Sequence, residues 1–295
     1  MKTRTRHQHL QRIDRVVALL QAAVEQGNEL PELATLAAAA HLSPFHFHRI
    51  YRALAGETVG NTVARLRLLR ALQLLAEPDG RVTEAALAVG YETPQAFARA
   101  FRQAFDTTPS DMRRQGVRLQ QEIERLRQPS PGEGVAFSPL KVEVVSVEPF
   151  RLVAIRHVGD PVGLGQTYGR LFQWMAERGA LEQMAGIYGV PHDDPRDVPR
   201  EHCAFECALA LAGEGPETVG EVHPLQLGGG LWARARHVGS YDHLDDFTDH
   251  FIADWLSDSG YTLRDAWPFR HFHDDPEETP EAVLRADIYL PVEPG

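Results

Sequence analysis

The chain has 295 residues, 43% of them hydrophobic, which is enough for a buried core and for two domains of roughly 100 to 200 residues each. No apolar run approaches the roughly 18 residues of a membrane helix, and the first residues lack the apolar core of a signal peptide. The two cysteines, Cys203 and Cys207, lie about 13 Å apart in an expected strand, too far for a disulfide. We therefore expect a cytoplasmic protein in a reducing compartment, with no membrane partner.

The net charge of −11 is unevenly distributed along the chain. Residues 1–128 hold 18 Lys and Arg against 13 Asp and Glu, a balance of +5, whereas residues 129–295 hold 12 against 28, a balance of −16. This asymmetry is typical of a polyanion-binding module fused to a module with another partner. Two prolines and two glycines follow a charged helical stretch and predict a linker at 128–138, between domains at 1–127 and 139–295.

The basic half is expected to be all helical and to contain the same unit twice. Residues 43–52 match residues 93–102 at an offset of 50. Each copy opens with a hydroxyl N-cap, Ser43 or Thr93, followed by proline at the first helical position. Each then carries an aromatic pair that we expect to be buried: Phe47 with Tyr51, and Phe97 with Phe101. A short alanine-rich helix and a tight turn precede each copy, which is typical of a helix-turn-helix motif.

A single helix over residues 61–76 is predicted between the two units, about 24 Å long. With the flanking turns, it would set the two second helices about 34 Å apart, so that one chain enters two successive major grooves. Residues 10–114 resemble the DNA-binding domain of the AraC family. The family signature of the second unit is matched by Gly90-Tyr91, Phe97 to Phe101 and Pro109-Ser-Asp-Met-Arg113, with Met112 replacing the usual aromatic residue.

The second helix of each unit carries the expected DNA contacts. Arg49 and Arg99 occupy matching places, and a guanidinium can read guanine edges in the major groove. The other residues expected to face the groove are Phe45, His46, His48, Gln95 and Ala98. Arginines expected to bind phosphates, which position the protein without reading sequence, are Arg52, Arg102, Arg113 and Arg114.

The acidic half contains a second repeat, at an offset of about 80. The repeated segments are Arg156-His-Val-Gly159 with Arg236-His-Val-Gly239, His192-Asp-Asp-Pro195 with His273-Asp-Asp-Pro276, and Trp174 with Trp255. Each copy reads as a strand, an amphipathic helix and two strands joined by a polar loop. We therefore predict a multidomain chain: an all-α double helix-turn-helix domain, then an α+β domain of two β-α-β-β repeats.

The closing strands of the two repeats align Glu206 with Asp287 on one face of the sheet. Residues 139–292 resemble the GyrI-like effector-binding domain, whose two repeats flank a ligand cleft. In that family a closing strand reading acid-Ile-Tyr-x-Pro supplies a carboxylate to the cleft, and Asp287 to Pro291 matches it with Asp in place of the usual Glu. A partly desolvated carboxylate would select an organic cation. The aromatic residues expected to bind the ligand are Tyr168, Trp174, Trp255, Trp267 and Tyr289.

No metal, cofactor or catalytic residue is predicted. Five histidines invite a metal hypothesis, but their spacing lacks thiolates and a second cluster: His46, His48, His192, His271 and His273. The glycines at 163–165 and 228–230 do not form a nucleotide-binding loop.

The resulting hypothesis is a transcription regulator that binds double-stranded DNA and a small effector. The effector changes how the reading helices are presented or how RNA polymerase is recruited. The resemblance leaves two alternatives, because some GyrI-like proteins hydrolyse small electrophiles and stand-alone members bind gyrase.

Overall fold

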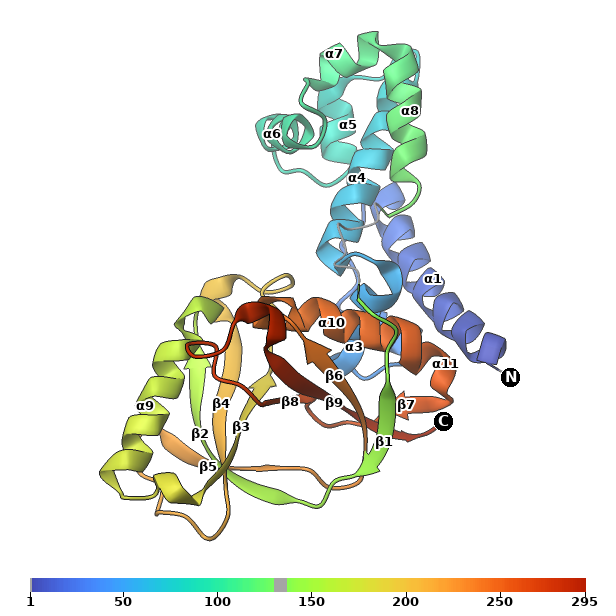
Figure 1. Ribbon diagram of the computed structural model, residues 1–295. Helices are drawn as coiled ribbons and strands as arrows, with labels where there is room; N and C mark the ends of the chain where they lie inside the picture. Colours follow the sequence, from blue (N-terminus) through green and yellow to red (C-terminus); the bar gives the residue numbers. More distant parts are fainter. Residues whose placement is uncertain (1, 130–136) are drawn as a thin grey trace. The chain divides into compact units, whose positions relative to one another are not determined.

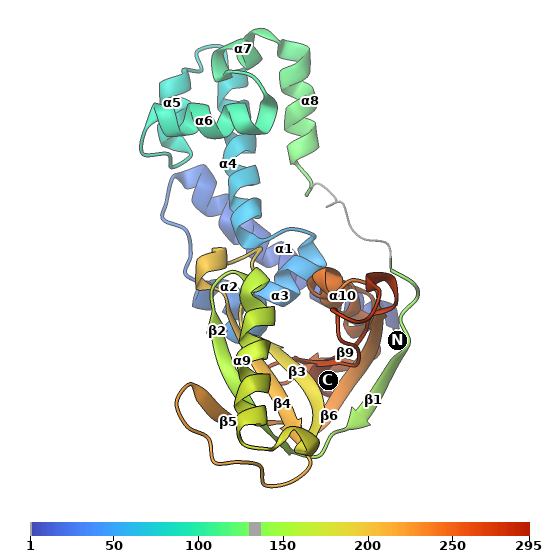
Figure 2. The same ribbon diagram turned by 60° about the vertical axis from the view of Figure 1, so that its left-hand side comes forward.

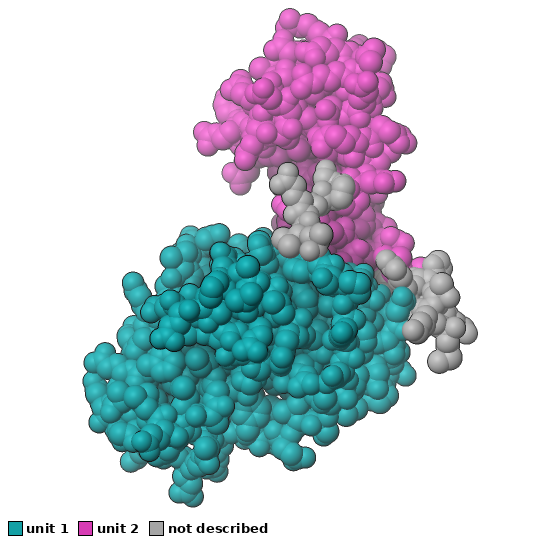
Figure 3. Space-filling view, in the orientation of Figure 1, with its two compact units in different colours: residues 1–5, 135–295 teal, residues 6–134 magenta. Residues whose placement is uncertain are grey.

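The computed structural model describes residues 2–129 and 137–295, except the side chains of residues 2–9 and of Phe45. It divides into two compact units, residues 6–134 and residues 1–5 with 135–295 (Figure 3). Most of the predicted linker, residues 130–136, lies outside the described residues. No helix in the described part of the chain has the length and apolar character needed to cross a membrane.

The helical unit is organised around the long helix that joins its two helix-turn-helix halves (Figure 1). Its helices are α1 (Lys2–Gln26), α2 (Leu33–Ala39), α3 (Pro44–Ala55), α4 (Val59–Ala76), α5 (Val82–Ala88), α6 (Pro94–Phe105), α7 (Pro109–Arg114) and α8 (Gly116–Leu126). Helix α4 contributes Leu66 to the core around α2 and α3, and Leu72 to the core around α5 and α6. It begins two residues before the predicted start because Thr58 caps it, accepting a hydrogen bond from Asn61 N at 3.1 Å.

Both helix-turn-helix units form as predicted, and each turn uses a left-handed residue. His41 has φ 54° and Gly90 has φ 81°. The aromatic pairs four residues apart are buried, with ring centroids 5.6 Å apart in the first unit and 5.4 Å apart in the second. Thr93 caps α6 by accepting from Ala96 N at 3.1 Å. The expected cap at Ser43 is wrong: its side chain makes no cap hydrogen bond, and α3 starts with Pro44 alone.

The second unit consists of one antiparallel sheet and two long helices (Figures 1 and 2). Its strands are β1 (Val142–Ser146), β2 (Phe150–Val158), β3 (Met184–Pro191), β4 (Ala204–Leu211), β5 (Val222–Leu227), β6 (Leu231–Val238), β7 (Tyr261–Leu263), β8 (Phe269–Phe272) and β9 (Arg285–Pro294). Its helices are α9 (Leu164–Glu177), α10 (Leu244–Phe251) and the short α11 (Ser257–Ser259). The strand order is β1-β6-β9-β8-β3-β4-β2-β5, with β7 paired to β9.

The predicted α+β class and its β-α-β-β repeats are confirmed as β2-α9-β3-β4 and β6-α10-β8-β9, but each repeat begins with one further strand, and the second repeat also contains the short β7. Strand β1 precedes β2 and β5 precedes β6, again at an offset of 80. These two strands are exchanged: β1 pairs with β6, and β5 pairs with β2. Each repeat therefore completes the sheet of the other. Pro224 is tolerated in β5 because β5 lies at the sheet edge.

A π-helical turn absorbs the one-residue difference between the repeats. The offset is 80 at the start of the helices, Leu164 and Leu244, but 81 at their ends, Gly179 and Gly260. The extra residue lies in the second helix, where Ile252–Leu256 form a π turn between α10 and α11. A π turn accommodates an additional residue without ending the helix. The apolar faces of both helices therefore stay in phase with the sheet.

Candidate functional site

The two faces of the sheet are covered differently. Directly paired residues of adjacent strands lie on the same face of the sheet. Arg156 pairs with Glu206, Arg236 pairs with Asp287, and His271 pairs with both Asp287 and Tyr188. We call the face that carries these side chains the triad face, because each repeat places an arginine and a histidine on a buried carboxylate there. Helices α9 and α10 pack on the opposite, helix face, where Leu171 and Met175 of α9 meet Val153 and Leu209 (Figure 2). The predicted alternation of Glu206 and Asp287 against their apolar neighbours is confirmed.

The second repeat places an arginine and a histidine on its buried carboxylate. Arg236 Nε and Nη2 donate to the two oxygens of Asp287 at 2.7 and 2.9 Å. His273 Nε2 lies 3.0 Å from Asp287 Oδ2. Burial alone would raise the pKa of Asp287, but Arg236 and His273 hold it below its ordinary value. Asp287, 2% exposed, is therefore a carboxylate with its hydrogen-bonding capacity largely used.

The first repeat carries the equivalent triad of Arg156, His192 and Glu206, with looser contacts. Arg156 Nη1 donates to Glu206 Oε1 at 3.3 Å, and His192 Nε2 lies 3.5 Å from the same oxygen. Glu206 Oε2 is 3.2 Å from His223 Nε2 of β5 but makes no hydrogen bond of good geometry. Burial again raises the pKa of Glu206. His192, His223 and Arg156 lower it by more than burial raises it, so the pKa lies below the ordinary value. Glu206 is therefore the carboxylate that retains hydrogen-bonding capacity.

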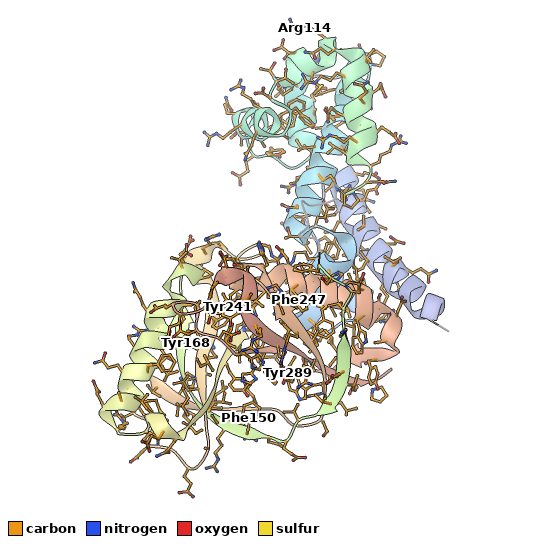
Figure 4. The ribbon with its side chains drawn as sticks, in the orientation of Figure 1. Arg114, Phe150, Tyr168, Tyr241, Phe247 and Tyr289 are labelled. Atoms are coloured by element: carbon orange, nitrogen blue, oxygen red, sulfur yellow. The ribbon has the colours of Figure 1, made fainter. Side chains whose placement is uncertain are left out.

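Aromatic rings fill the triad face between the two carboxylates. Tyr188 stacks on His271 with centroids 4.4 Å apart and planes 7° apart, and Phe269 stacks on Tyr289 at 4.4 Å and 16°. Phe150 packs 5.1 Å from Tyr188, and both Phe150 and Tyr289 are labelled in Figure 4. Burial, and then His273, lower the pKa of His271 to about 4, so this imidazole is neutral at pH 7. Phe269 is 1% exposed and belongs to the core, whereas Tyr188, His271 and Tyr289 are half-buried, so this surface offers parts of three rings beside charged groups.

The predicted aromatic ligand residues divide between the two faces. Tyr289 lies on the triad face, and Trp267 packs against His192 with ring centroids 4.3 Å apart. The other three lie elsewhere. Tyr168 of α9 donates from the helix face to the main-chain oxygen of Tyr188 at 2.6 Å, Trp174 belongs to the core under α9, and Trp255 stacks on Tyr261. These three do not lie beside Glu206 and Asp287, because helix periodicity turns their side chains toward the opposite face or the helix end.

The repeated sequence motifs are explained by these contacts. In Arg-His-Val-Gly, the arginine binds the carboxylate on the triad face, while the next residue points the other way: His237 Nε2 lies 2.9 Å from Ser240 O. In His-Asp-Asp-Pro, the histidine completes the triad and the first aspartate accepts from the start of the closing strand, as Asp193 does from Ala204 N at 3.0 Å. The sequence displayed both motifs, but only the strand pairing shows that they meet.

The second reading helix presents a polar stripe opposite its core face. Gln95, Arg99 and Arg102 of α6 are exposed, while Phe97 and Phe101 are fully buried. Ala98 is half-buried beside the stripe. The spacing of three and four residues puts the three polar side chains on one side of the helix.

The flanking arginines of α7 differ. Arg113 Nη2 donates to Pro78 O at 2.6 Å, which ties α7 to the turn before α5. Arg114 is 3.6 Å from Asp111 and its side chain is 77% exposed, at the end of the unit in Figure 4.

The predicted contacts on the first reading helix, α3, differ among themselves in exposure. In α3, His48 is exposed, Arg49 is half-buried, and His46 and Arg52 are buried. The side chain of Phe45 lies outside the described residues.

Each of the two units matches a known protein family. Residues 140–293 match the model of the GyrI-like small molecule binding domain, and residues 36–115 match a helix-turn-helix domain. The probable transcriptional regulator YgiV of Escherichia coli K12 is 27% identical over 154 residues, 52% of this chain and 96% of YgiV. The probable transcription factor PqrA of Proteus vulgaris is 35% identical over 92 residues, 31% of this chain and 75% of PqrA.

A solved EcmrR–DNA complex aligns with 90% of this chain and all of that chain, at 14% identity and a TM-score of 0.41. The two family matches and the similarity to PqrA establish the family. The chain therefore belongs to the GyrI-like small-molecule-binding family and carries an AraC-type helix-turn-helix domain, the combination of a transcriptional regulator that responds to a small molecule.

Proposed function

We propose that the chain controls transcription by inserting α3 and α6 into two successive major grooves, and that an effector bound on the triad face changes this binding. The exposed stripe of Gln95, Arg99 and Arg102 on α6 is the observation that carries the DNA part. Arginine and glutamine can each form paired hydrogen bonds with base edges. Arg114, at the end of the unit, is suited to a phosphate contact.

The proposed effector is a flat aromatic molecule carrying a positive or hydrogen-donating group. Stacked rings on the triad face supply apolar contact, and Glu206 supplies a buried carboxylate oxygen that lacks a hydrogen bond of good geometry. Asp287 is a weaker candidate because Arg236 and His273 already hold both of its oxygens. This assignment narrows the symmetric pair expected from the sequence to one residue.

Selection of duplexes from a random library by the full-length protein tests the DNA part. We expect enrichment of two half-sites about one helical turn apart. Anisotropy titrations of the selected duplex, with and without a panel of organic cations and neutral aromatic compounds, then test the response. Absence of any enriched sequence would contradict the DNA proposal, whereas enrichment with no compound altering affinity would restrict the doubt to the effector or to its coupling with DNA.

We also propose that the second unit binds its ligand without turning it over and that the bound regulator acts on RNA polymerase. The support is that relatives of both halves are described as transcription factors or regulators. In vitro transcription from a promoter containing the selected duplex should change with protein. Steady hydrolysis of reactive esters or epoxides that is lost in Glu206→Gln would favour the hydrolase alternative.

A further inference from the structure

We propose that His271, His273 and Asp287 bind a divalent transition-metal ion on the triad face, and that the ion replaces Arg236 on the Asp287 carboxylate. In the described part of the chain, these three residues are the group whose donor atoms could meet on one ion, all within 4.8 Å of one another. Two imidazoles and one carboxylate are a donor set that zinc and similar ions prefer. The proposal does not depend on the identity of the effector.

Strand pairing, rather than a flexible loop, brings the donors together. His271 lies in β8 and pairs directly with Asp287 of β9. His273 follows two residues later, so its side chain returns to the same face of the sheet. Its main chain is held as well, because His273 N donates to Arg285 O at 3.0 Å. The backbone positions of the three donors are therefore set by the fold before any ion binds.

The donor atoms, all within 4.8 Å of one another, need to approach by at most about 1.4 Å. Donors on a tetrahedral zinc ion, each about 2.0 to 2.1 Å from the metal, lie about 3.4 Å apart. His273 Nε2 and Asp287 Oδ2 are already 3.0 Å apart. The His271 ring lies parallel to Tyr188, with planes 7° apart, so it can slide within the stack toward the other donors. The fourth position on the ion would be left for water or a ligand.

Arg236 holds the Asp287 carboxylate in the structure. Its guanidinium bonds both oxygens of Asp287, and Nη2 lies 3.3 Å from His273 Nε2. This contact keeps a buried carboxylate paired, which a buried charge requires. The Arg236 side chain is nevertheless 49% exposed, so it can turn into solvent when a doubly charged ion takes its place. Arginine and metal are thus competitors for one carboxylate.

The first repeat supplies an internal comparison. Glu206 and His192 stand at the places of Asp287 and His273, at an offset of 81, but the place of His271 is taken by Val190. The second histidine near Glu206, His223, comes instead from β5. The sequence predicts no metal at the histidines because their spacing lacks thiolates and a second cluster, and because neighbouring strand or loop positions do not converge. The missing donor was Asp287, which strand pairing brings to them.

Zinc titration calorimetry and cobalt absorption spectroscopy on metal-stripped full-length protein test the site. We expect one site with visible cobalt bands typical of nitrogen and oxygen ligands. His271→Val, which copies the first repeat, should lower affinity at least about tenfold and remove the bands. His192→Val, which removes the triad histidine of the other repeat, should leave both unchanged. Near-UV circular dichroism of each variant confirms that it is folded.

Arg236→Gln should change zinc affinity in the opposite direction to His271→Val. Removing the competitor should raise zinc affinity several-fold, whereas an arginine that merely supports the site would lower it when removed. The proposal is overturned if wild type gives no cobalt bands, if His271→Val binds like wild type, or if Arg236→Gln weakens zinc binding while remaining folded.

Discussion

Arg65 and Glu57 form a buried two-pronged ion pair, and Arg65 Nη1 also donates to the main-chain oxygen of Leu126, the last residue of α8, at 2.8 Å. Glu57 accepts a further hydrogen bond from Thr62 at 2.8 Å, and Thr62 Oγ1 lies 2.7 Å from Tyr51 Oη. One polar network therefore links α3, α4 and the end of α8. The network therefore holds the end of α8 to α4 within the helical unit.

Removing Arg65 should destabilise the helical unit strongly. Arg65→Met leaves Glu57 as an unpaired buried charge, so we expect the free energy of unfolding to fall by about 3 to 5 kcal/mol. Urea denaturation followed by circular dichroism measures the change. The exposed pair of Arg81 and Glu84 is the control, and Arg81→Ala should stay within about 0.5 kcal/mol. Similar losses of unfolding free energy in both variants would show that the buried ion pair contributes no more to stability than an exposed one.

Two arginines should affect DNA binding differently. Arg99→Ala removes an expected base contact and should weaken binding to the selected duplex by about 1 to 3 kcal/mol, with little effect on random duplex. Arg114→Ala should weaken both and reduce the salt dependence by about one unit of slope. Anisotropy titrations at several salt concentrations separate the two, and Arg125→Ala on α8 serves as an exposed control. Equal loss on both duplexes in Arg99→Ala would make Arg99 a phosphate contact.

The helical unit was predictable because its signals are local. Proline at the first helical position and the aromatic pairs act within a dozen residues, the repeat at an offset of 50 shows that the same unit occurs twice, and the structure reproduces them. Ser43 is the exception, since whether a hydroxyl reaches the first turn depends on its rotamer and neighbours. In the second unit, alternation correctly assigned Glu206 and Asp287 to one face, because strand side chains alternate regardless of which strands are adjacent.

The contacts that define the triad face were not predictable from those signals. Strand alternation does not say which strand lies next to which, so the exchange of β1 and β5 and the pairing of Arg236 with Asp287 stayed hidden. Helix periodicity likewise shows that Trp174 is buried but not which face of the sheet it covers. The offset between the two repeats changes from 80 to 81 in the sequence. This change indicates that the second helix carries one inserted residue.

The stability contributed by Glu206 should disappear in acid. Its pKa in the folded protein lies below the ordinary value of 4.5, so its ionised form stabilises the fold above that pH, and the contribution is lost as pH falls through the lowered pKa. The difference in unfolding free energy between wild type and Glu206→Gln should therefore be larger at pH 5 than at pH 3. Urea titrations at both values measure it, and a difference that grows on acidification would contradict the assigned pairing.

Gly228 should not tolerate a side chain. Gly228 lies in the turn that connects β5 to β6 and has φ +88°. A Cβ added to it would lie 2.4 Å from the main-chain oxygen of Glu148. Gly228→Ala should lower stability by at least about 1 to 2 kcal/mol, because both the left-handed backbone and the close contact oppose it. Thermal unfolding measures the loss. Gly213→Ala, where a Cβ meets nothing within 4 Å, should change little.

The two carboxylates of the triad face should contribute unequally to effector binding. Glu206→Gln should weaken a cationic aromatic ligand about tenfold, roughly 1.4 kcal/mol, because Glu206 Oε2 lacks a hydrogen bond of good geometry. Asp287→Asn should change affinity less and stability more, because its oxygens already serve Arg236 and His273. Tryptophan fluorescence titrations on metal-free protein measure affinity, with a neutral aromatic ligand as the control that neither variant should affect. A larger affinity loss in Asp287→Asn would return the ligand-binding role to the second repeat.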